Sequence, residues 1–333
     1  MKSLIIHIGY PKTATSTIQN RLFYKKYLDG NIHFLGKAAF DDTNFNPSGR
    51  LVSSLCNNQY VSSSINLEKD KLNIISNEDF PLSFYNIDNQ TFLPIKNPIK
   101  TADNLKNYID NHLGENINTQ IVVFIRNQLD LIHSAYTEGY VWYFRHERSL
   151  NTFDKFLEQG LRKKDGGIFL MFYFYKVLKR YADLFGRENV HIFFYEDIMN
   201  DINCILKKFN KLFAFSENEI QNAFEKKDNV KQRNVLGYST KKLTIQMILS
   251  DLVNKNQVLG KMSKNNYMKK YLKPFYDYSR KLNIGYQKNI PYIDNERKSE
   301  IIDMFYDDNF SLAEYFSLSK DKMKNYGYFG YND

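Results

Sequence analysis

The sequence predicts an α/β fold in which a parallel sheet lies between two layers of helices. Four short apolar segments, at residues 4–8, 71–76, 121–125 and 189–195, have the length and composition of buried strands. Polar or turn-forming residues follow each segment, and helical patterns lie between the segments. Strands that alternate with helices form parallel sheets covered on both faces. We therefore expect three layers around a parallel sheet.

The length and the later helical patterns favour one domain over two. The chain has 333 residues, of which 43% are hydrophobic, enough for a sizeable core. We expect a single domain over residues 1–333, with a core sheet over about 1–215 and a helical cap over about 216–333. Irregular or short helical structure is expected at 29–70 and a loop at 81–100; helices are expected at 102–113, from Phe153, and at 172–185, 201–214, 216–227, 239–260, 265–282 and 296–316.

Charge and cysteine content restrict the function. A formal net charge of +9 favours anionic ligands, although a general bias toward lysine would give the same value. Two cysteines predict neither a disulfide framework nor a metal-ligand cluster, so we expect no metal. We see no signal-peptide core and no run near the roughly 18 apolar residues of a membrane span. This predicts a cytoplasmic protein; peripheral contact with a membrane stays open.

The segment after the first strand has the composition of a phosphate-binding loop. Gly9 and Pro11 end the strand, and apolar residues then recur at helical spacing. Such a loop aims backbone N–H groups and a helix N-terminus at an anion. Lys12 adds a positive charge, and Ser16 with Gln19 fits a capping box. We expect the hydroxyl groups to be donors to the anion; they belong to Thr13, Thr15, Ser16 and Thr17. The alternative is an ordinary strand-to-helix turn.

The loop is not a Walker loop. A Walker loop that starts at Gly9 requires Gly at position 14 and Lys at position 15, where this chain has Ala14 and Thr15. Residues 10–17, Tyr-Pro-Lys-Thr-Ala-Thr-Ser-Thr, instead resemble the 5′-phosphosulfate loop of sulfotransferases that use 3′-phosphoadenosine 5′-phosphosulfate (PAPS). That family usually has Gly in place of Ala14. A negative φ would tolerate the methyl group of Ala14, whereas a positive φ would be strained.

A carboxylate follows the second predicted strand. In open α/β sheets, ligands lie outside the carboxyl ends of the strands. Ser76-Asn77-Glu78 resembles the pattern of glycan sulfotransferases, in which a glutamate at this position is the catalytic base. The resemblance implies that Glu78 accepts the acceptor's proton. Without it, Glu78 would be a surface or helix-start carboxylate.

The third predicted strand ends at Arg126, and Asn127 is placed to cap the following helix. Arg126 and Ser134, eight positions later, resemble the family's 3′-phosphate site. The alternatives are a strand-end ion pair for Arg126 and a buried helix hydroxyl for Ser134. Two such segments about 110 residues apart are much more specific than either one alone.

Later segments carry weaker signals. Residues 140–148 combine aromatic and basic side chains, which suit a sugar acceptor or a helix with one face in the core. His146 is the second candidate for the base. Lys231 and Arg233 lie in a basic break where the family has a loop that closes over the nucleotide, although a solvated charge cluster fits as well. Tyr195-Glu196-Asp197 resembles an architectural element of bacterial members, and we assign Glu196 no catalytic role.

The resemblance implies the P-loop, nucleotide-kinase-like fold of the bacterial sulfotransferase branch. It also implies transfer of a sulfuryl group from PAPS to an acceptor hydroxyl, with adenosine 3′,5′-bisphosphate (PAP) as product. We expect a carbohydrate or glycolipid acceptor. One alternative is a small-molecule kinase on the same fold, against which the displaced lysine argues. The other is a non-enzymatic polyanion-binding module; nucleic acid is not expected because the distinctive residues fall at strand ends.

Overall fold

The computed structural model divides the chain into two compact units. The first, here called the sheet unit, comprises residues 1–135, 160–228 and 295–333; the second comprises residues 136–159 and 229–294. The structure describes residues 2–40, 43–57, 59, 65–83, 87–88, 91–92, 96–114, 117–146, 153–162, 167–225 and 293–330. In the second unit it describes the end of helix α5 (Gln128–His146) and most of helix α6 (Phe153–Arg162).

Five parallel strands form the sheet, in the order β2-β5-β1-β8-β9. The four predicted strands are confirmed as β1 (Lys2–Gly9), β5 (Leu72–Asn77), β8 (Ile117–Ile125) and β9 (Val190–Phe194). Each is rich in the β-branched and aromatic residues that pack well on a pleated surface.

The expectation of irregular or short helical structure at 29–70 is confirmed by the short helix α3 (Gly49–Cys56) but missed the strands of this region. Strand β2 (Ile32–Phe34) pairs with β5 at the edge of the sheet, and β3 (Ala38–Phe40) forms a hairpin with β4 (Thr43–Phe45). A second hairpin, β6 (Ile87–Asp88) with β7 (Thr91–Phe92), lies in the predicted loop. Elements of two or three residues are too short to show a period in the sequence, so their pairing partners decide them.

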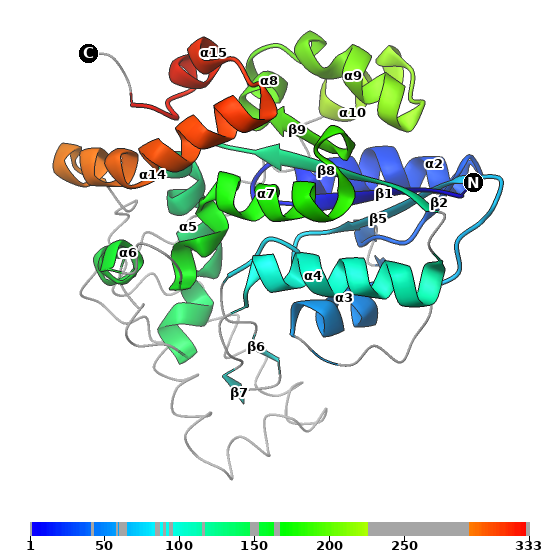
Figure 1. The fold of residues 1–333 in the computed structure, drawn as a ribbon, viewed down its shortest axis with the longest axis horizontal. Coiled ribbons are helices and arrows are strands. Elements are labelled where there is room, and N and C mark those ends of the chain that lie inside the picture. The colour runs from blue at the N-terminus through cyan, green and yellow to red at the C-terminus, as the bar shows by residue number, and fades with distance from the viewer. Residues whose placement is uncertain are drawn as a thin grey trace, which may run out of the picture. The chain divides into compact units, whose positions relative to one another are not determined.

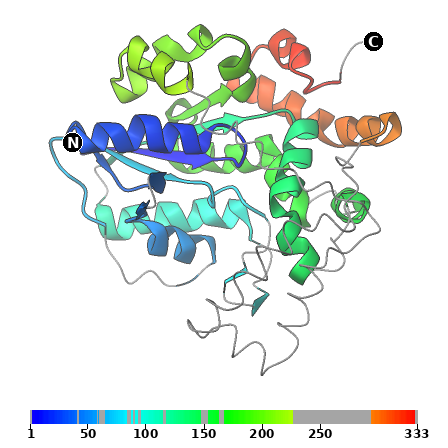
Figure 2. The ribbon, with the colours of Figure 1, turned by 180° about the vertical axis from the view of Figure 1, so that it is seen from behind.

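Helices cover both faces of the sheet, as predicted (Figures 1 and 2). One layer contains a continuous helix made of α1 (Thr15–Thr17), the π-helical η1 (Ile18–Phe23) and α2 (Tyr24–Leu28), together with α9 (Asn203–Phe213) and α10 (Glu217–Glu225). The other contains α3 (Gly49–Cys56), α4 (Pro98–Tyr108), which continues as η2 (Ile109–Leu113), and α7 (Phe174–Phe185).

The shorter elements are η4 (Gly167–Phe172), η5 (Arg187–Asn189) and α8 (Tyr195–Asn200). The last helices of the described chain are α14 (Asn295–Phe316) and α15 (Lys320–Asn325). Two helices from the predicted cap region, α10 and α14, pack directly on the layers, against η1 and α7 respectively. The predicted helices at 239–260 and 265–282 lie outside the described residues. Within the described ranges, no helix is both long and apolar enough to cross a bilayer.

Aromatic side chains fill the space between the sheet and the layer of α2 and α9. Successive strand residues point to opposite faces, so Phe124 of β8 and Phe193 of β9 share one face, where their rings stack at 4.9 Å. Phe209 of α9 and Phe23 of η1 are fully buried in the same cluster. Aromatic pairs of this kind add about 0.5–1.5 kcal/mol each beyond the burial of their area.

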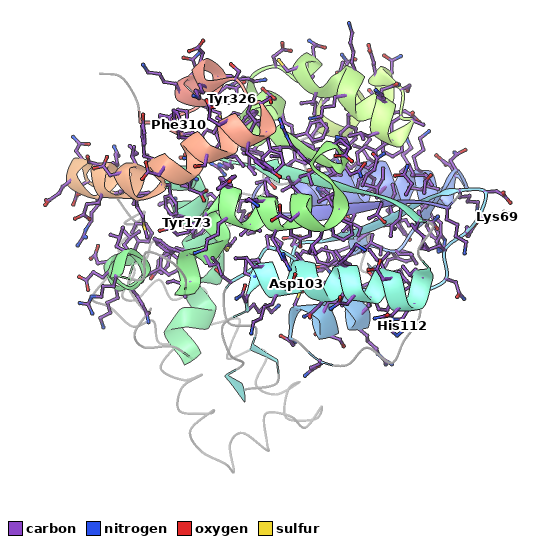
Figure 3. The ribbon with its side chains drawn as sticks, in the orientation of Figure 1. Lys69, Asp103, His112, Tyr173, Phe310 and Tyr326 are labelled. Atoms are coloured by element: carbon purple, nitrogen blue, oxygen red, sulfur yellow. The ribbon has the colours of Figure 1, made fainter. Side chains whose placement is uncertain are left out.

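An ion pair and an aromatic contact join the helices of the opposite layer. Arg180 of α7 donates from Nε to Oδ1 of Asp103 on α4, at 2.6 Å (Figure 3). Tyr173, just before α7, packs its ring 4.9 Å from that of Phe305 on α14. These contacts hold α4 and α14 on α7, and through it on the sheet.

A buried polar cluster joins the centre of the sheet to the first helix. His7 of β1 lies 2.7 Å, through Nδ1, from Oγ of Ser76 on β5, and Gln19 donates to the same oxygen at 3.0 Å. All three side chains are buried. The predicted capping box is therefore wrong: Gln19 turns toward Ser76, 57 residues away, instead of back to Ser16. A buried acceptor on the neighbouring strand satisfies its amide where water cannot.

Acid should destabilise the protein through His7. Burial lowers the pKa of His7 from 6.5 to about 3. Below about pH 6.5, His7 therefore binds a proton in the unfolded chain but not in the folded chain. The free energy of unfolding falls by about 1.4 kcal/mol for each unit by which the pH is lowered. Between pH 7 and pH 5 we expect His7 to account for a loss of about 2 kcal/mol, measured by urea denaturation.

The variant His7→Leu removes this titration, so the pH dependence of its unfolding free energy should be shallower by that amount. Phe23→Leu is the matched control, because Phe23 packs edge-on to His7 at 5.7 Å and the substitution weakens the same cluster without removing the imidazole. Equal pH slopes for the wild type and His7→Leu would contradict the prediction.

Candidate active site

The carboxyl ends of three neighbouring strands meet at one edge of the sheet. Because β1 lies between β5 and β8, the parallel register pairs Ile8 with Asn77 and Gly9 with Phe124. Glu78 comes directly after Asn77, and Arg126 comes two positions after Phe124. The loop that follows Gly9 and contains Lys12 therefore begins between these two residues. Lys12 and Glu78 are 66 positions apart in the chain, and Glu78 and Arg126 are 48 apart. All three predicted residues nevertheless lie at the same end of the sheet.

The loop after β1 is held in a tight, strained conformation. Lys12 and Ala14 have φ angles of 64° and 63°, in the left-handed region. A Cβ atom on Gly9 would lie 2.4 Å from Cγ2 of Thr15, so the close approach of loop and strand requires glycine. Ala14 is thus strained, the outcome expected for a positive φ.

Two of the predicted hydroxyl donors face inward. Thr13 and Thr15 are buried, and both donate from Oγ1 to the carbonyl oxygen of Tyr10, at 2.7 and 2.9 Å. They hold the turn closed instead of extending toward a ligand. Ser16 is exposed and Thr17 is half-buried, and donation from these two hydroxyls to an anion stays a prediction.

The helix after the loop begins without a side-chain cap. Ala14 occupies the N-cap position, and among the described residues no side chain bonds to the first amides. The continuous helix of α1, η1 and α2 follows this residue. Its first N–H groups and the positive end of its dipole therefore lie at the end of the loop. Exposed Lys12 lies in the same loop. Helix N-termini with this geometry suit anions, and anion binding by this loop stays a prediction.

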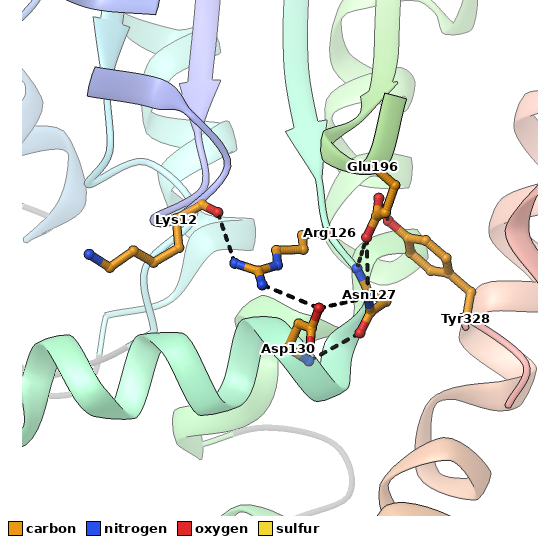
Figure 4. Close-up of polar contacts among 6 residues, drawn as sticks. All are labelled: Lys12, Arg126, Asn127, Asp130, Glu196 and Tyr328. Carbon is orange, nitrogen blue, oxygen red and sulfur yellow. Dashed lines mark hydrogen bonds and ion pairs between the residues drawn. The ribbon is translucent and has the colours of Figure 1, made fainter. Parts of the chain in front are cut away.

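Arg126 connects the end of β8 to this loop (Figure 4). Its guanidinium donates to the carbonyl oxygen of Lys12 at 3.4 Å and to Oδ2 of Asp130 at 3.2 Å. It also stacks over the ring of Tyr195, 4.9 Å from the centroid. Arg126 is therefore fixed beside the loop before any ligand binds, and its side chain remains 21% exposed.

The segment that carries Arg126 is fixed in turn from β9 and the C-terminal region. Asn127 caps helix α5, as predicted, by accepting from the amide of Asp130 at 3.0 Å. Its own amide donates to Oε1 of Glu196 at 2.8 Å, and Tyr328 donates to the other oxygen of Glu196 at 3.3 Å (Figure 4). Burial raises the pKa of Glu196, while the bonds from Asn127 lower it. Glu196 thus has the architectural place expected of it.

Asp197, the neighbour of Glu196, anchors the last helix. Tyr326 donates to its Oδ1 at 2.6 Å, and Lys322 lies 2.7 Å from the same oxygen. Together with the bond from Tyr328, this contact ties α15 and the residues after it to the end of β9 (Figure 3).

Glu78 lies in the turn directly after β5. The turn is fixed by the amide of Asp79, which donates to Oδ1 of Asn77 at 2.9 Å. Glu78 is half-buried and lies at the carboxyl end of β5, next to the strand from which the loop of residues 10–17 starts. This is the position in which an open α/β sheet places a ligand.

Comparison with known proteins decides the family. A family model described as "Sulfotransferase domain" matches residues 3–290. The chain belongs to this family. A sulfotransferase structure from Alicyclobacillus acidocaldarius has 12% identity and a TM-score of 0.46, covering 97% of this chain and 98% of its own. The mouse sulfotransferase SULT7A1 complexed with PAP has 13% identity and a TM-score of 0.35, covering 95% and 88%. No curated protein sequence matches.

The remaining predicted site residues of this sulfotransferase are less closely placed. Ser134 is half-buried, two turns into α5, on the helix that Asn127 caps. His146 ends the same helix, and its side chain lies outside the description. Lys231 and Arg233 lie outside the described residues. No group of three or more side chains able to hold a metal occurs in the part of the sulfotransferase that the structure describes.

Sequence analysis missed two residues that hold Arg126. Asp130 follows Arg126 by four positions, a spacing that often pairs opposite charges. Tyr195 comes directly after β9, the neighbour of β8, so the strand order explains its contact with Arg126. The first signal is present in the sequence; the second requires the order of the strands.

Replacing Ala14 with Gly should stabilise the sulfotransferase. The left-handed conformation costs an L-residue about 1–2 kcal/mol, and glycine's greater freedom in the unfolded chain offsets about 0.4–1 kcal/mol of the gain. We expect the free energy of unfolding to rise by about 0.5–1 kcal/mol, measured by chemical denaturation.

Two alanines provide matched controls for this substitution. Ala214, at the end of α9, has a φ of 54°, so Ala214→Gly should also stabilise. Ala182 lies inside α7, where glycine costs about 1 kcal/mol, so Ala182→Gly should destabilise. If Ala14→Gly behaves like Ala182→Gly, the loop is not strained at this position.

Proposed function

We propose that this protein transfers a sulfuryl group from PAPS to an acceptor hydroxyl on a carbohydrate or glycolipid. The observation that carries the proposal is the approach of Arg126 to the loop of Lys12, with Glu78 at the adjoining strand end. The sulfotransferase family match, over residues 3–290, supports the reaction class and a single functional domain.

In this proposal, the loop of residues 10–17 supplies the site for the donor's 5′-phosphosulfate. Lys12 and the amides of residues 13–17 would bind the 5′-phosphate and neutralise it as it leaves. The absence of a side-chain cap among the described residues supports this role, because the first helical amides then have hydrogen-bonding capacity for a ligand.

Arg126 and Ser134 would recognise the 3′-phosphate, the group that distinguishes PAPS from ATP. The contacts of Arg126 with Asp130 and Tyr195 support the role, since a preorganised guanidinium loses less entropy when it binds. Lys231 and Arg233 would close over the nucleotide; this part of the proposal rests on the sequence.

In the proposed reaction, the charged side chains at the strand ends assist transfer of the sulfuryl group. The acceptor oxygen attacks sulfur in line, a sulfur–oxygen bond to the acceptor forms, and the bond from sulfur to the 5′-phosphate oxygen breaks. By analogy with phosphoryl transfer, catalysis is mainly positioning and stabilisation of charge. Glu78 accepts the acceptor's proton, and Lys12 compensates the charge that develops on the leaving phosphate. The products are a sulfate ester and PAP.

Two features of the sequence support a carbohydrate acceptor. Residues 140–148 offer aromatic rings and cationic groups beside His146, the second candidate for the base. The net charge of +9 suits acidic or sulfated glycans.

PAP should stabilise the fold more than ATP–Mg does. A ligand that binds only the folded state at 100 times its Kd adds about 2.7 kcal/mol, which a melting curve resolves readily. Arg126→Ala should weaken PAP by about 1.5–3 kcal/mol but leave adenosine 5′-phosphosulfate, which lacks the 3′-phosphate, nearly unchanged. Arg187→Ala, which removes the same charge from η5, is the control. A larger shift with ATP–Mg would favour the kinase alternative.

Glu78 and Lys12 should separate catalysis from donor binding. Glu78→Gln keeps the shape of the side chain and removes the proton acceptor, so kcat should fall by about 10²–10⁴ while donor affinity is retained. Lys12→Ala should reduce both, because the lysine contacts the donor before and during transfer. Initial rates and PAP binding by calorimetry measure the two effects. Normal turnover by Glu78→Gln, with loss of activity in His146→Ala, would transfer the role of base to His146.

A further inference from the structure

A hollow of about 400 Å³ opens at the amino ends of the strands, the opposite end of the sheet from the candidate active site. Its floor is formed by β1, β5, β8 and β9, and its wall by α9. The lining side chains are Ser3, Leu4, Ile5, Leu72, Asn118, Gln120, His191, Lys208, Lys211 and Leu212.

The floor carries polar side chains, of which Ser3 and Asn118 are exposed. A parallel sheet covered by helices on both faces normally presents apolar residues to each layer. Here the register places Ser3 beside Asn118 and Ile5 beside Gln120, on the face that α9 covers. Further along the same face, Val122 and Phe124 restore the apolar pattern. The buried cluster of His7, Ser76 and Gln19 on this face is joined by its own hydrogen bonds, whereas Asn118 and Gln120 line the hollow.

The wall carries positive charge that the hollow does not balance. Among the described residues that line it, Lys208 and Lys211 are basic and none is acidic. Lys208 is held in place, since its ammonium donates to the carbonyl oxygen of Ile192 at 3.1 Å and lies 4.7 Å from the ring centre of Phe193. Burial lowers the pKa of Lys208, and the charge of Asp197, which does not line the hollow, partly offsets this. An anion bound in the hollow would stabilise the ammonium further.

The side chain of His191, at the base of the hollow, is affected by the positive charges of Lys208 and Lys211. Its Nε2 is buried and has no hydrogen-bond partner among the described residues. Burial, and then the charges of Lys208 and Lys211, lower the pKa of His191 from 6.5 to about 4. The two lysines are thus close enough to the floor to act on its side chains.

We propose that this hollow is a second anion site, separate from the active site, which binds a tetrahedral oxyanion: phosphate or sulfate, free or as an ester group. Lys208 and Lys211 supply the charge, and Asn118 and Gln120 supply neutral donors. The volume lies within the range of small-molecule sites, so an ester substituent can be accommodated as well.

The test is a titration of the full-length protein with inorganic phosphate, and separately with sulfate, at constant ionic strength maintained with chloride. The imidazole signals of His191 are followed by NMR in histidine-labelled protein. We expect a saturable change and a rise in the pKa of His191, because a neighbouring anion favours the imidazolium. Saturation with either anion supports the site and identifies the source of the oxyanion. A change that does not saturate, or that chloride reproduces, overturns the proposal.

Lysine variants locate the effect. Lys208→Gln and Lys211→Gln should each raise the Kd for the oxyanion by about tenfold or more, the size of a charge-assisted hydrogen bond. Lys207→Gln is the matched control: it removes the same charge from an exposed neighbour on α9 that does not line the hollow. Equal affinities for Lys207→Gln and Lys208→Gln would overturn the proposal.

The phosphate loop requires its own control, because it is expected to bind the same anions. Lys12→Ala should weaken anion binding at that loop and leave the response of His191 unchanged. Loss of the His191 response in Lys12→Ala would assign the signal to the active site and overturn the proposal. Because this readout does not depend on sulfuryl transfer, the anion site and the enzymatic activity can fail independently.

Discussion

The parallel pairing of β1 with β5 on one side and β8 on the other is the constraint on which the candidate site depends. Neighbouring parallel strands end at the same edge, so the pairing brings a loop, a carboxylate and a guanidinium together from distant parts of the chain. The buried contacts of Ser76 with His7 and Gln19 reinforce it, because they bind β1, β5 and the first helix at the level of the site. A shift of register would leave these polar groups unpaired in the core.

The loop after β1 shows how local strain and buried hydrogen bonds combine. Left-handed conformations at Lys12 and Ala14 are unfavourable for L-residues, yet they turn the backbone so that the next helix begins at the edge of the sheet. The hydroxyls of Thr13 and Thr15 offset part of this cost by binding the carbonyl of Tyr10. The first amides of the helix remain uncapped by side chains in the described region. The strain therefore serves the exposure of backbone donors.

Electrostatic preorganisation is the second theme of the site. Arg126 is positioned by an acid, a carbonyl group and an aromatic ring, and the segment beside it is fixed by Glu196 and, through Glu196, by Tyr328. The chain thus links the proposed 3′-phosphate site to its own C-terminal region, where Tyr326 and Lys322 bind Asp197. A cation held in this way needs little reorganisation when an anion arrives.

The sequence by itself determined the local features of this protein. Apolar runs predicted the four main strands, the Gly-Tyr-Pro-Lys segment predicted the loop between strand and helix, and Asn127 predicted the cap of α5, because burial, turn formation and capping are encoded by neighbouring residues. Only the tertiary structure decided which strands are neighbours, that β2 joins the sheet, and that Gln19 binds Ser76 instead of Ser16. It also turned the hydroxyls of Thr13 and Thr15 inward and placed Tyr195 under Arg126. These outcomes depend on partners that are far away in the chain. The order of the strands fixes the positions of these partners, and no pattern of neighbouring residues predicts them.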